Sequence, residues 1–323
     1  MQNLTKLNTF EESLLKILKE KEGPVSGEKL AQLFGISRVS IWKKIKKLKN
    51  LGYPISIHKK GYELSYKDIF LQEDLENLLK ATEYFKEVVY LLETTSTMDV
   101  AKNLAEAGKK AIVIAERQSQ GKGRLGRKWE SHEGGLWITL ILQESLPLRK
   151  AHFLTYLSSV AIALAIRETF NLPAKVKWPN DVLLYDKKVA GILLEIKAEV
   201  DRLLYALIGM GINVNNKVEG KAFLFPATSI CENLKSQVKR LPLFKNILKH
   251  FEELLQNKER ILPMWKEFSC TLGKMVRVET TDRTIIGWAL DLDDQGALLI
   301  KTLEGSIEKI YSGDCFHLRN FNI

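Results

Sequence analysis

Hydrophobic and polar positions at the start of the chain follow the spacing of two short α-helices. Leucine and isoleucine recur every three to four residues over 9–21, which predicts a helix with Thr9 as its N-cap. Gly23 ends this helix. Ser26 is expected to cap a second helix that stops at Gly35, because glycine accepts the left-handed conformation found at helix C-termini.

A third helix is predicted over 38–50, with Ser37 as its cap. Its apolar residues Ile41, Ile45 and Leu48 fall on one face, so the helix is expected to pack along this stripe. Arginine and lysine fill the rest of its surface.

Residues 53–64 alternate apolar and polar side chains on both sides of a turn at 58–61, which predicts two short strands. Two helices joined by a short turn, the second one basic and followed by such a strand pair, are typical of a winged helix-turn-helix domain. We assign it residues 1–65.

The distribution of charge supports this interpretation. Residues 1–65 carry 13 Lys and Arg against 6 Asp and Glu, whereas the net charge of the whole chain is only +10. A local excess of this kind indicates a polyanionic partner, such as operator DNA, although a solvated lysine face would give the same count. The candidates for base contacts are Arg38, Ser40 and Lys43, and those for phosphate contacts are Lys44, Lys47, Lys59 and Lys60.

Beyond residue 65 the pattern mixes strands and helices. A helix is expected over 72–86, and long helical patterns follow at 98–108 and 154–170. Strands are expected at 88–93, 110–118, 135–142, 174–178, 182–185, 188–196 and 202–214. Because strands follow strands directly, the fold class is α+β with an antiparallel or mixed sheet rather than a doubly wound one.

Composition excludes several classes of protein. No run reaches the roughly 18 apolar residues that span a bilayer, and the first residues have no apolar signal core, so we expect neither a membrane protein nor an exported one. The three cysteines, Cys231, Cys270 and Cys315, are too few and too far apart for a disulfide framework or a CxxC metal knuckle, which favours the cytoplasm.

The segment GKGRLGRKW, residues 121–129, contains a GxGxxG pattern between two predicted strands. No helix follows it, so it is not expected to be a dinucleotide-binding fingerprint or a P-loop. Its four cations lie among three glycines, and glycine lets the backbone approach a ligand closely. The segment therefore predicts a phosphate-binding loop that a ligand orders, the alternative being an exposed basic loop.

A second segment, VKWPND, places Lys177 at the end of a strand and beside a turn. Pro179 disfavours helix before it, and Asn180 and Asp181 favour a turn. A lysine held there suits the binding of a phosphate or carboxylate, although a surface lysine in a hairpin is equally compatible with the pattern.

Six motifs in one order resemble the catalytic domain of biotin–protein ligases: TSTMDVAK, ERQSQGKGRLGRKW, VKWPND, KVAGILLE, GMGINVN and PATSI. GWALDLDDQGALLIKT and YSGD resemble the small β-barrel that ends these enzymes, and the winged helix is similar to that of the bifunctional members, which also repress biotin-synthesis genes. The resemblance covers essentially the whole chain. It implies a central domain of the class II synthetase-like kind over 66–269 and a small β-barrel over 270–323.

The resemblance implies a ligase that uses ATP with Mg²⁺, forms biotinyl-5′-AMP, and transfers biotin to a lysine of biotin carboxyl carrier protein. The implied biotin-binding residues are Ser96, Thr97, Met98, Gln118, Lys122, Gly123, Arg124, Lys177 and Gly191. The implied ATP-binding residues are Arg124, Arg127, Trp129, Lys177, Asn213 and Ala227, with Lys177 and Arg124 as the catalytic pair and no metal ligands assigned. Arg319 is a further candidate for ATP. Trp178 is expected to pack in the core.

Two positions depart from the family pattern. Met98 stands where the family often has Asn or Gln, so its contact is limited to backbone or apolar groups, and Lys122 replaces a common Arg and loses the bidentate fork. The alternatives are a ligase whose winged helix does not repress, a ligand-sensing transcription factor without ligase activity, and a lipoate ligase of the same fold. A repressor is expected to dimerise, and we expect contact through sheet edges of the central domain when the adenylate is bound.

Overall fold

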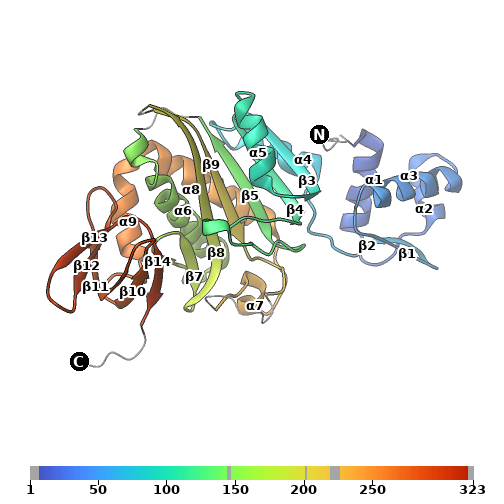
Figure 1. The fold of residues 1–323 in the computed structure, drawn as a ribbon. Coiled ribbons are helices and arrows are strands. Elements are labelled where there is room, and N and C mark those ends of the chain that lie inside the picture. The colour runs from blue at the N-terminus through green and yellow to red at the C-terminus, as the bar shows by residue number, and fades with distance from the viewer. Residues whose placement is uncertain (1–6, 144–146, 201, 219–225, 319–323) are drawn as a thin grey trace.

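The computed structural model describes residues 7–143, 147–200, 202–218 and 226–318 of the chain, so Arg319 lies outside the described residues. Figure 1 shows a helical unit at the N-terminal side, a large central sheet with helices, and a small β unit at the C-terminal side.

The N-terminal unit confirms the predicted winged helix-turn-helix. Its elements are α1 (Thr9–Glu20), α2 (Gly27–Phe34), α3 (Arg38–Asn50), β1 (Ile55–His58) and β2 (Gly61–Leu64). Ser26 and Ser37 cap α2 and α3 as predicted, and Gly35 ends α2 in the left-handed conformation. The stripe on α3 is fully buried in the core of this unit, which also takes in Ile69 and Leu71.

Thr9 is not the cap of α1. Asn8 occupies that position: its Oδ1 accepts from the amide of Glu11 at 2.9 Å, and its own amide donates to the Glu11 carboxylate at 3.3 Å. This reciprocal pair satisfies two amides at once and places Thr9 as the first helical residue.

The helix expected over 72–86 is shorter, because α4 spans only Gln72–Lys80. The carboxylate of Glu252 accepts from the amides of Glu83 and Tyr84 at 3.1 and 3.2 Å and also bonds the hydroxyl of Thr82. A distant carboxylate thus replaces the helical partners of these amides and turns the chain toward the sheet.

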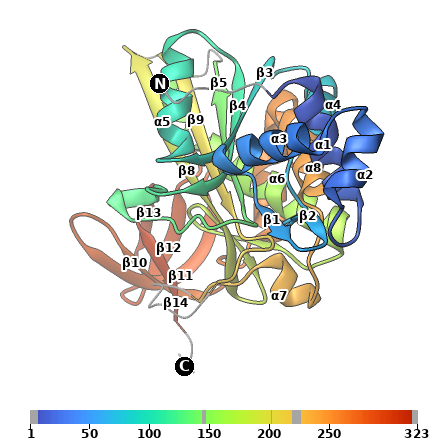
Figure 2. The same cartoon turned by 90° about the vertical axis from the view of Figure 1, so that its right-hand side faces the viewer.

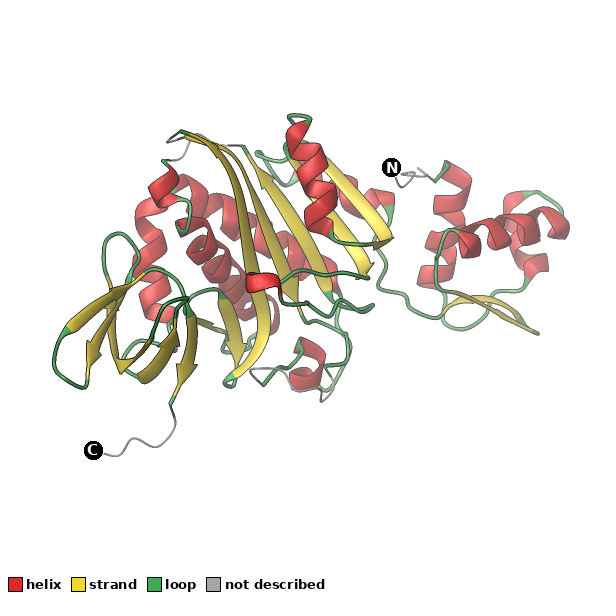
Figure 3. Ribbon diagram, viewed as in Figure 1, coloured by secondary structure: helices red, strands yellow, loops and turns green. Residues whose placement is uncertain are grey.

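Seven strands form the central sheet in the order β3-β4-β5-β9-β8-β7-β6. Their bounds are Glu87–Thr94 (β3), Ala111–Gln118 (β4), Leu136–Leu142 (β5), Lys175–Lys177 (β6), Asp181–Leu184 (β7), Lys187–Glu199 (β8) and Arg202–Ile212 (β9). β3 and β4 are parallel and the other neighbours are antiparallel, which confirms the mixed sheet (Figure 3).

Helices cover both faces of this sheet. On one face lie α6 (Phe153–Phe170), α8 (Arg240–Gln256) and α9 (Ile261–Phe268), and on the other lies α5 (Thr97–Glu106); the short α7 (Ile230–Leu234) follows β9. Alternation along β4 assigns the faces: Ile112 and Ile114 join the core under α6 and α8, and Ala111 and Val113 join the smaller core under α5.

Helix α6 has the length and composition of a membrane span, in contrast to the sequence-based expectation that no segment would. Most of it is buried against the sheet, α8 and α9. A core helix that is mostly buried needs no continuous polar face, which accounts for its composition.

The C-terminal unit is a five-stranded antiparallel sheet in the order β13-β12-β11-β10-β14. Its strands span Met275–Glu279 (β10), Thr284–Leu292 (β11), Leu298–Thr302 (β12), Ile307–Ile310 (β13) and Asp314–His317 (β14). A flat sheet of this size is about 19 Å wide, whereas the connection from Ile310 to Asp314 spans at most about 15 Å. The two edge strands must therefore curve toward each other, which gives the barrel-like form seen in Figure 2.

Candidate active site

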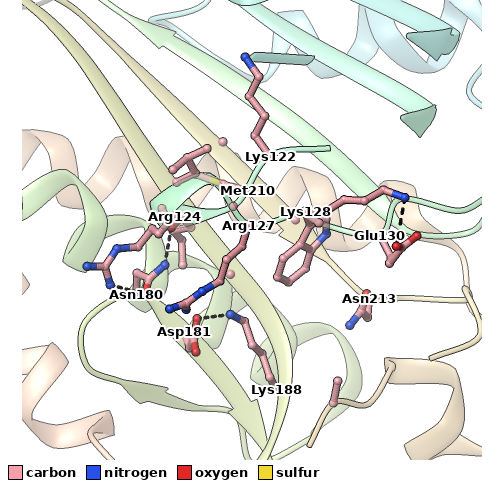
Figure 4. Close-up of a pocket in the computed structure, with 18 of the residues that line it drawn as sticks. Lys122, Arg124, Arg127, Lys128, Glu130, Asn180, Asp181, Lys188, Met210 and Asn213 are labelled. Atoms are coloured by element: carbon pink, nitrogen blue, oxygen red, sulfur yellow. Dashed lines mark hydrogen bonds and ion pairs between the residues drawn. The ribbon is translucent and has the colours of Figure 1, made fainter. Parts of the chain in front are cut away.

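Apart from Arg319, which lies outside the described residues, the predicted biotin- and ATP-binding residues all line a single cavity of about 420 Å³. They come from the start of α5, the end of β4, the loop 121–129, the β6–β7 turn, and β8 and β9 with the segments that follow (Figure 4). The fold thus brings together residues that are far apart in the sequence, while the assignment of this cavity as the site and the role of each residue stay predictions.

At one end of the cavity, hydrogen bonds fix the side chain of Gln118. Its Oε1 accepts from the amide of Thr97 at 2.7 Å, and its Nε2 donates to Ser131 Oγ at 2.8 Å. Thr139 in turn donates to the hydroxyl of Thr97 at 2.8 Å. Ser96, fully buried, caps α5 beside them. This part of the cavity is therefore preorganised, with few side-chain torsions left to be fixed by a ligand.

Met98 supplies an apolar wall next to this network. It is buried, and a Cβ added to Gly209 would lie 2.8 Å from its Sδ. The absence of a side chain at Gly209 lets the thioether lie against β9. The apolar contact predicted for this position is compatible with the structure.

The loop 121–129 folds back on itself as a flap. The amide of Gly123 donates to the carbonyl of Arg127 at 2.7 Å, and the amide of Trp129 donates to the carbonyl of Gly121 at 2.8 Å. A single 3₁₀ turn, Arg124–Gly126, forms its tip. No α-helix begins here, in agreement with the rejection of a dinucleotide fingerprint and a P-loop.

The cations of this flap are paired with groups of the protein, whereas the sequence predicts a loop that is ordered by a bound phosphate. Lys122 pairs with Asp99, Arg127 with Asp314, and Lys128 with Glu130 at 3.2 Å. The counter-charges Asp99 and Asp314 are too distant in sequence to be anticipated. Lys122 points away from Arg127 (Figure 4).

Arg124 reaches furthest across the cavity. It donates to Asn180 Oδ1 at 3.1 Å, to Ser312 Oγ at 3.0 Å and to the carbonyl of Gly313 at 3.4 Å. Because Ser312 and Gly313 precede β14, the flap and the C-terminal unit contact each other at the cavity, and both contribute to its lining. No pattern in the sequence points to these partners.

Lys177 ends β6 and is only 5% exposed. Burial lowers the pKa of its ammonium, and the neighbouring carboxylate of Asp181 opposes that effect. The residue after it, Trp178, is fully buried, as expected; its indole donates to the hydroxyl of Tyr156 at 3.1 Å and its amide donates to Thr271 Oγ1 at 3.1 Å. These bonds anchor the turn that carries Lys177, and the Trp178–Pro179 peptide is cis.

Sequence reasoning missed Lys188 as a site residue. Its Nζ lies 2.6 Å from Asp181 Oδ1 and 5.1 Å from the centre of the Trp129 ring. It opens the motif KVAGILLE, where it is followed directly by the four buried apolar and small residues of β8, 189–192. The charge of Lys188 directly before this apolar run was the sequence signal that could have identified it as a site residue. Among the lysines of the cavity, Lys188 is one whose charge acts directly on Lys177.

Trp129 lies on the sheet where two glycines leave room. A Cβ on Gly211 would lie 2.5 Å from the indole, and one on Gly191 would lie 2.9 Å from it. Gly191 is predicted to let biotin approach the backbone, and in this structure the group that approaches it is Trp129. The buried indole Nε1 has no hydrogen-bond partner.

Asn213 and Ala227 lie at the same end of the cavity. Asn213 Nδ2 donates to the carbonyl of Thr228 at 3.2 Å, and its Oδ1 accepts from Asn216 at 3.0 Å. Trp129 thus offers an aromatic face beside residues with fixed polar groups, an arrangement suited to a purine base.

The predicted DNA-binding residues divide into two groups. Arg38, Lys43, Lys59 and Lys60 are exposed. Lys47, which is also exposed, and the half-buried Lys44 lie 2.7 and 3.7 Å from the buried Glu11, and Ser40 bonds the capping hydroxyl of Ser37 at 2.9 Å. Burial alone would raise the pKa of Glu11, but the hydrogen bond from Lys47 keeps it below its ordinary value.

Comparisons with known proteins agree with this architecture. The chain matches the biotin/lipoate A/B protein ligase family over residues 89–213, the biotin protein ligase C-terminal domain over 271–318, and a helix-turn-helix domain over 11–63. It is 35% identical to the bifunctional ligase/repressor BirA of Bacillus subtilis, over 95% of this chain and 98% of that protein. The chain belongs to the bifunctional ligase/repressor family.

Other members and solved structures support the same assignment. The bifunctional ligase/repressor BirA of Escherichia coli is 27% identical over 97% of this chain and 98% of its own length. The biotin protein ligase of Aquifex aeolicus, solved in complex with biotin and ATP, superposes with a TM-score of 0.62 at 31% identity, covering 73% of this chain and 100% of that one. This member of the family is therefore a biotin–protein ligase with an N-terminal helix-turn-helix domain.

Proposed function

We propose that this cavity activates biotin with ATP and that the same chain then biotinylates a carrier protein. In the first step, a biotin carboxylate oxygen attacks the α-phosphorus, the bond to the β-phosphate breaks, and pyrophosphate leaves. In the second step, the amine of a carrier lysine attacks the acyl carbonyl, AMP leaves, and an amide forms. The observation that carries the proposal is the single cavity in which the predicted biotin and ATP residues of the described chain surround the buried Lys177.

Lys177 is the proposed catalytic cation. Biotin carboxylate and the ATP phosphates repel each other, and one ammonium between them lowers that barrier. A preorganised donor of this kind contributes about 3 kcal/mol to the stability of the transition state. Because Lys177 is already desolvated, its charge is poorly screened by water.

The flap supplies the remaining positive charge. Arg124 and Arg127 now bond Ser312, Gly313 and Asp314, and the ATP phosphates would replace these partners. The exchange keeps each guanidinium paired throughout. Arg124 would then cover the adenylate and keep water from the mixed anhydride.

Mg²⁺ would be bound mainly by the ATP phosphates. The described residues contain no group of three or more His, Cys, Asp or Glu side chains that could hold a metal by themselves. Magnesium in such sites uses one or two carboxylates, and the buried Asp181 is the carboxylate of this cavity whose chemistry fits. When bound, the ion would neutralise charge on the phosphates.

The test is exchange of labelled pyrophosphate into ATP, measured with biotin, with lipoate and with neither acid, followed by mass spectrometry of a biotin carboxyl carrier protein. We expect exchange only with biotin, and a mass increase of one biotinyl group on the carrier. Exchange that requires lipoate would indicate a lipoate ligase. No exchange, together with biotin-dependent DNA binding, would indicate a ligand sensor without ligase activity.

We also propose that the N-terminal domain binds operator DNA and that the adenylate-bound chain acts as a homodimer in the cytoplasm. The long β8–β9 hairpin exposes Ile196, Val200 and Leu204, which supports dimer contact through the sheet. Gel filtration at micromolar concentration, with and without biotin and ATP, tests the dimer. A chain that stays monomeric and leaves no footprint upstream of biotin-synthesis genes would be a ligase whose winged helix does not repress.

A further inference from the structure

Two apolar side chains project from the face of α3 that the domain does not bury. Val39 is 63% exposed and Trp42 is 46% exposed, whereas Ile41 and Ile45 beside them are fully buried. Residues three apart on a helix are neighbours, so Val39 and Trp42 form one exposed apolar patch.

This patch lies among positive charges. Arg38, Lys43 and Lys46 are exposed on the same helix, and the Nζ of Lys46 lies 5.1 Å from the centre of the Trp42 ring. A positively charged frame around an apolar patch complements a polyanion that also presents apolar groups. The major groove of DNA is such a surface, because each thymine projects a C5-methyl group into it.

The patch also lies where a helix-turn-helix domain meets base edges. The N-terminal half of the second helix enters the major groove in this motif, and Val39 and Trp42 lie in that half of α3. Ser40, by contrast, is engaged with the capping serine, and Lys44 and Lys47 turn toward Glu11 on α1. The outer face of the helix therefore presents the apolar pair between its flanking cations.

We propose that Val39 and Trp42 read A·T pairs in the operator by contact with thymine methyl groups. Arg38, Lys43 and Lys46 then contact phosphates and other base edges around them. This inference rests on the proposed DNA binding and adds to it the residues that determine which DNA sequence is bound. It replaces Ser40 as a base-reading residue.

The test begins with selection of binding sites from randomised duplex DNA by the full-length protein in the presence of biotin and ATP. Each thymine of the selected site is then replaced by deoxyuridine, which removes only the methyl group, and affinity is measured by fluorescence anisotropy at one fixed salt concentration. We expect replacement at one or more thymines of each half-site to weaken binding about fourfold per methyl.

Variants connect the methyl groups to the side chains. Val39→Ala or Trp42→Ala is expected to abolish the difference between thymine and deoxyuridine at the position that the side chain contacts. Leu33→Ala, which removes an apolar side chain on α2 that is 59% exposed, is the matched control and should keep the difference. Lys43→Ala should weaken both duplexes to the same extent and reduce the salt dependence.

The outcomes separate this inference from the function on which it rests. If the wild-type protein enriches no sequence, the proposed DNA binding fails. If it enriches a site but no deoxyuridine changes the affinity, the inference is overturned. The same holds if both apolar variants keep the wild-type difference between thymine and deoxyuridine. Either result would indicate that the patch binds a protein partner. Because both side chains are exposed, circular dichroism melting curves should match the wild type and exclude misfolding as the cause.

Discussion

Lys177 combines two properties that the structure explains separately. Its position is fixed because the next residue, Trp178, is bonded to Tyr156 and Thr271. Its chemistry is altered because the ammonium is buried beside Asp181. A lysine with a fixed position and a lowered pKa is therefore suited to act on a bound anion in this cavity.

Lys177→Ala is expected to lower the rate of biotin adenylation by about 10²- to 10³-fold, because one preorganised donor is lost. Pyrophosphate exchange measures this rate. Lys175→Ala, two residues earlier on the same strand and exposed, is the control and should keep nearly wild-type activity. Near-normal turnover of the Lys177 variant would refute its catalytic role.

The pH dependence follows from the direction of the pKa shift. Below its lowered pKa Lys177 carries a proton and binds anions; as the pH rises through that value, the charge is lost. We expect kcat/KM for adenylation to fall on the alkaline side, with a midpoint below the ordinary lysine pKa of 10.5. Lys177→Arg should move the fall to higher pH even if its rate is lower, and an unmoved midpoint would assign the fall to another group.

At the residue scale, local sequence located Lys177 because proline and a turn follow it directly. It could not locate Asp314 or Ser312, which bond the flap across more than 180 residues of chain. Nor could it foresee that Lys44 and Lys47 share the buried carboxylate of Glu11. Pairings of this kind depend on the folded arrangement.

At the element scale, strand β9 serves both ends of the cavity through two glycines. Gly211 leaves room for Trp129 on the side of the predicted adenine site, and Gly209 leaves room for Met98 on the side of the predicted biotin site. One strand therefore shapes both subsites, and a methyl group added at each glycine should affect them differently.

Gly211→Ala is expected to raise the KM for ATP about tenfold, because the new Cβ displaces an indole and overpacking of this kind costs roughly 1–3 kcal/mol. Gly209→Ala should instead raise the KM for biotin, and by less, since the flexible end of Met98 can move. Initial-rate kinetics with each substrate varied in turn measure both effects. Equal changes in the two KM values for both variants would contradict this division.

The elements themselves were largely predictable, since alternation and caps revealed the winged helix and the strands of the mixed sheet. Their ends were less so. Helix α4 stops at Lys80 because Glu252 binds the amides that follow, and α1 begins at Thr9 because Asn8 pairs with Glu11. Periodicity gives the middle of an element, and its termini depend on individual hydrogen bonds.

At the scale of the whole molecule, Arg240 connects the N-terminal unit to the sheet. Fully buried, it bonds Asp68 of the linker at 2.8 Å, Glu116 of β4 at 2.9 Å and the carbonyl of Gly135 at 2.6 Å. Tyr90 donates to the same Glu116 oxygen at 2.7 Å. Three separate parts of the chain thus depend on one guanidinium.

Arg240→Met is expected to lower the free energy of unfolding by about 3–5 kcal/mol, because it leaves Glu116 buried without its charge partner. Urea denaturation measures the change. Adding Glu116→Gln should recover part of the loss, and Lys239→Met, an exposed neighbour, should have little effect. A single variant as stable as the wild type would contradict this role of Arg240.

The apolar surface of α6 has a consequence for synthesis of the protein. The helix ends at Phe170, but α8 and α9, which cover it, begin only at Arg240 and Ile261. In a nascent chain, this apolar segment of 18 residues therefore leaves the ribosome about 70 residues before the first of the helices that cover it. Translation that stalls in this interval would release a product prone to aggregate or to engage chaperones. The order of the helices in the sequence therefore determines the stage of synthesis at which the ligase is most prone to aggregate.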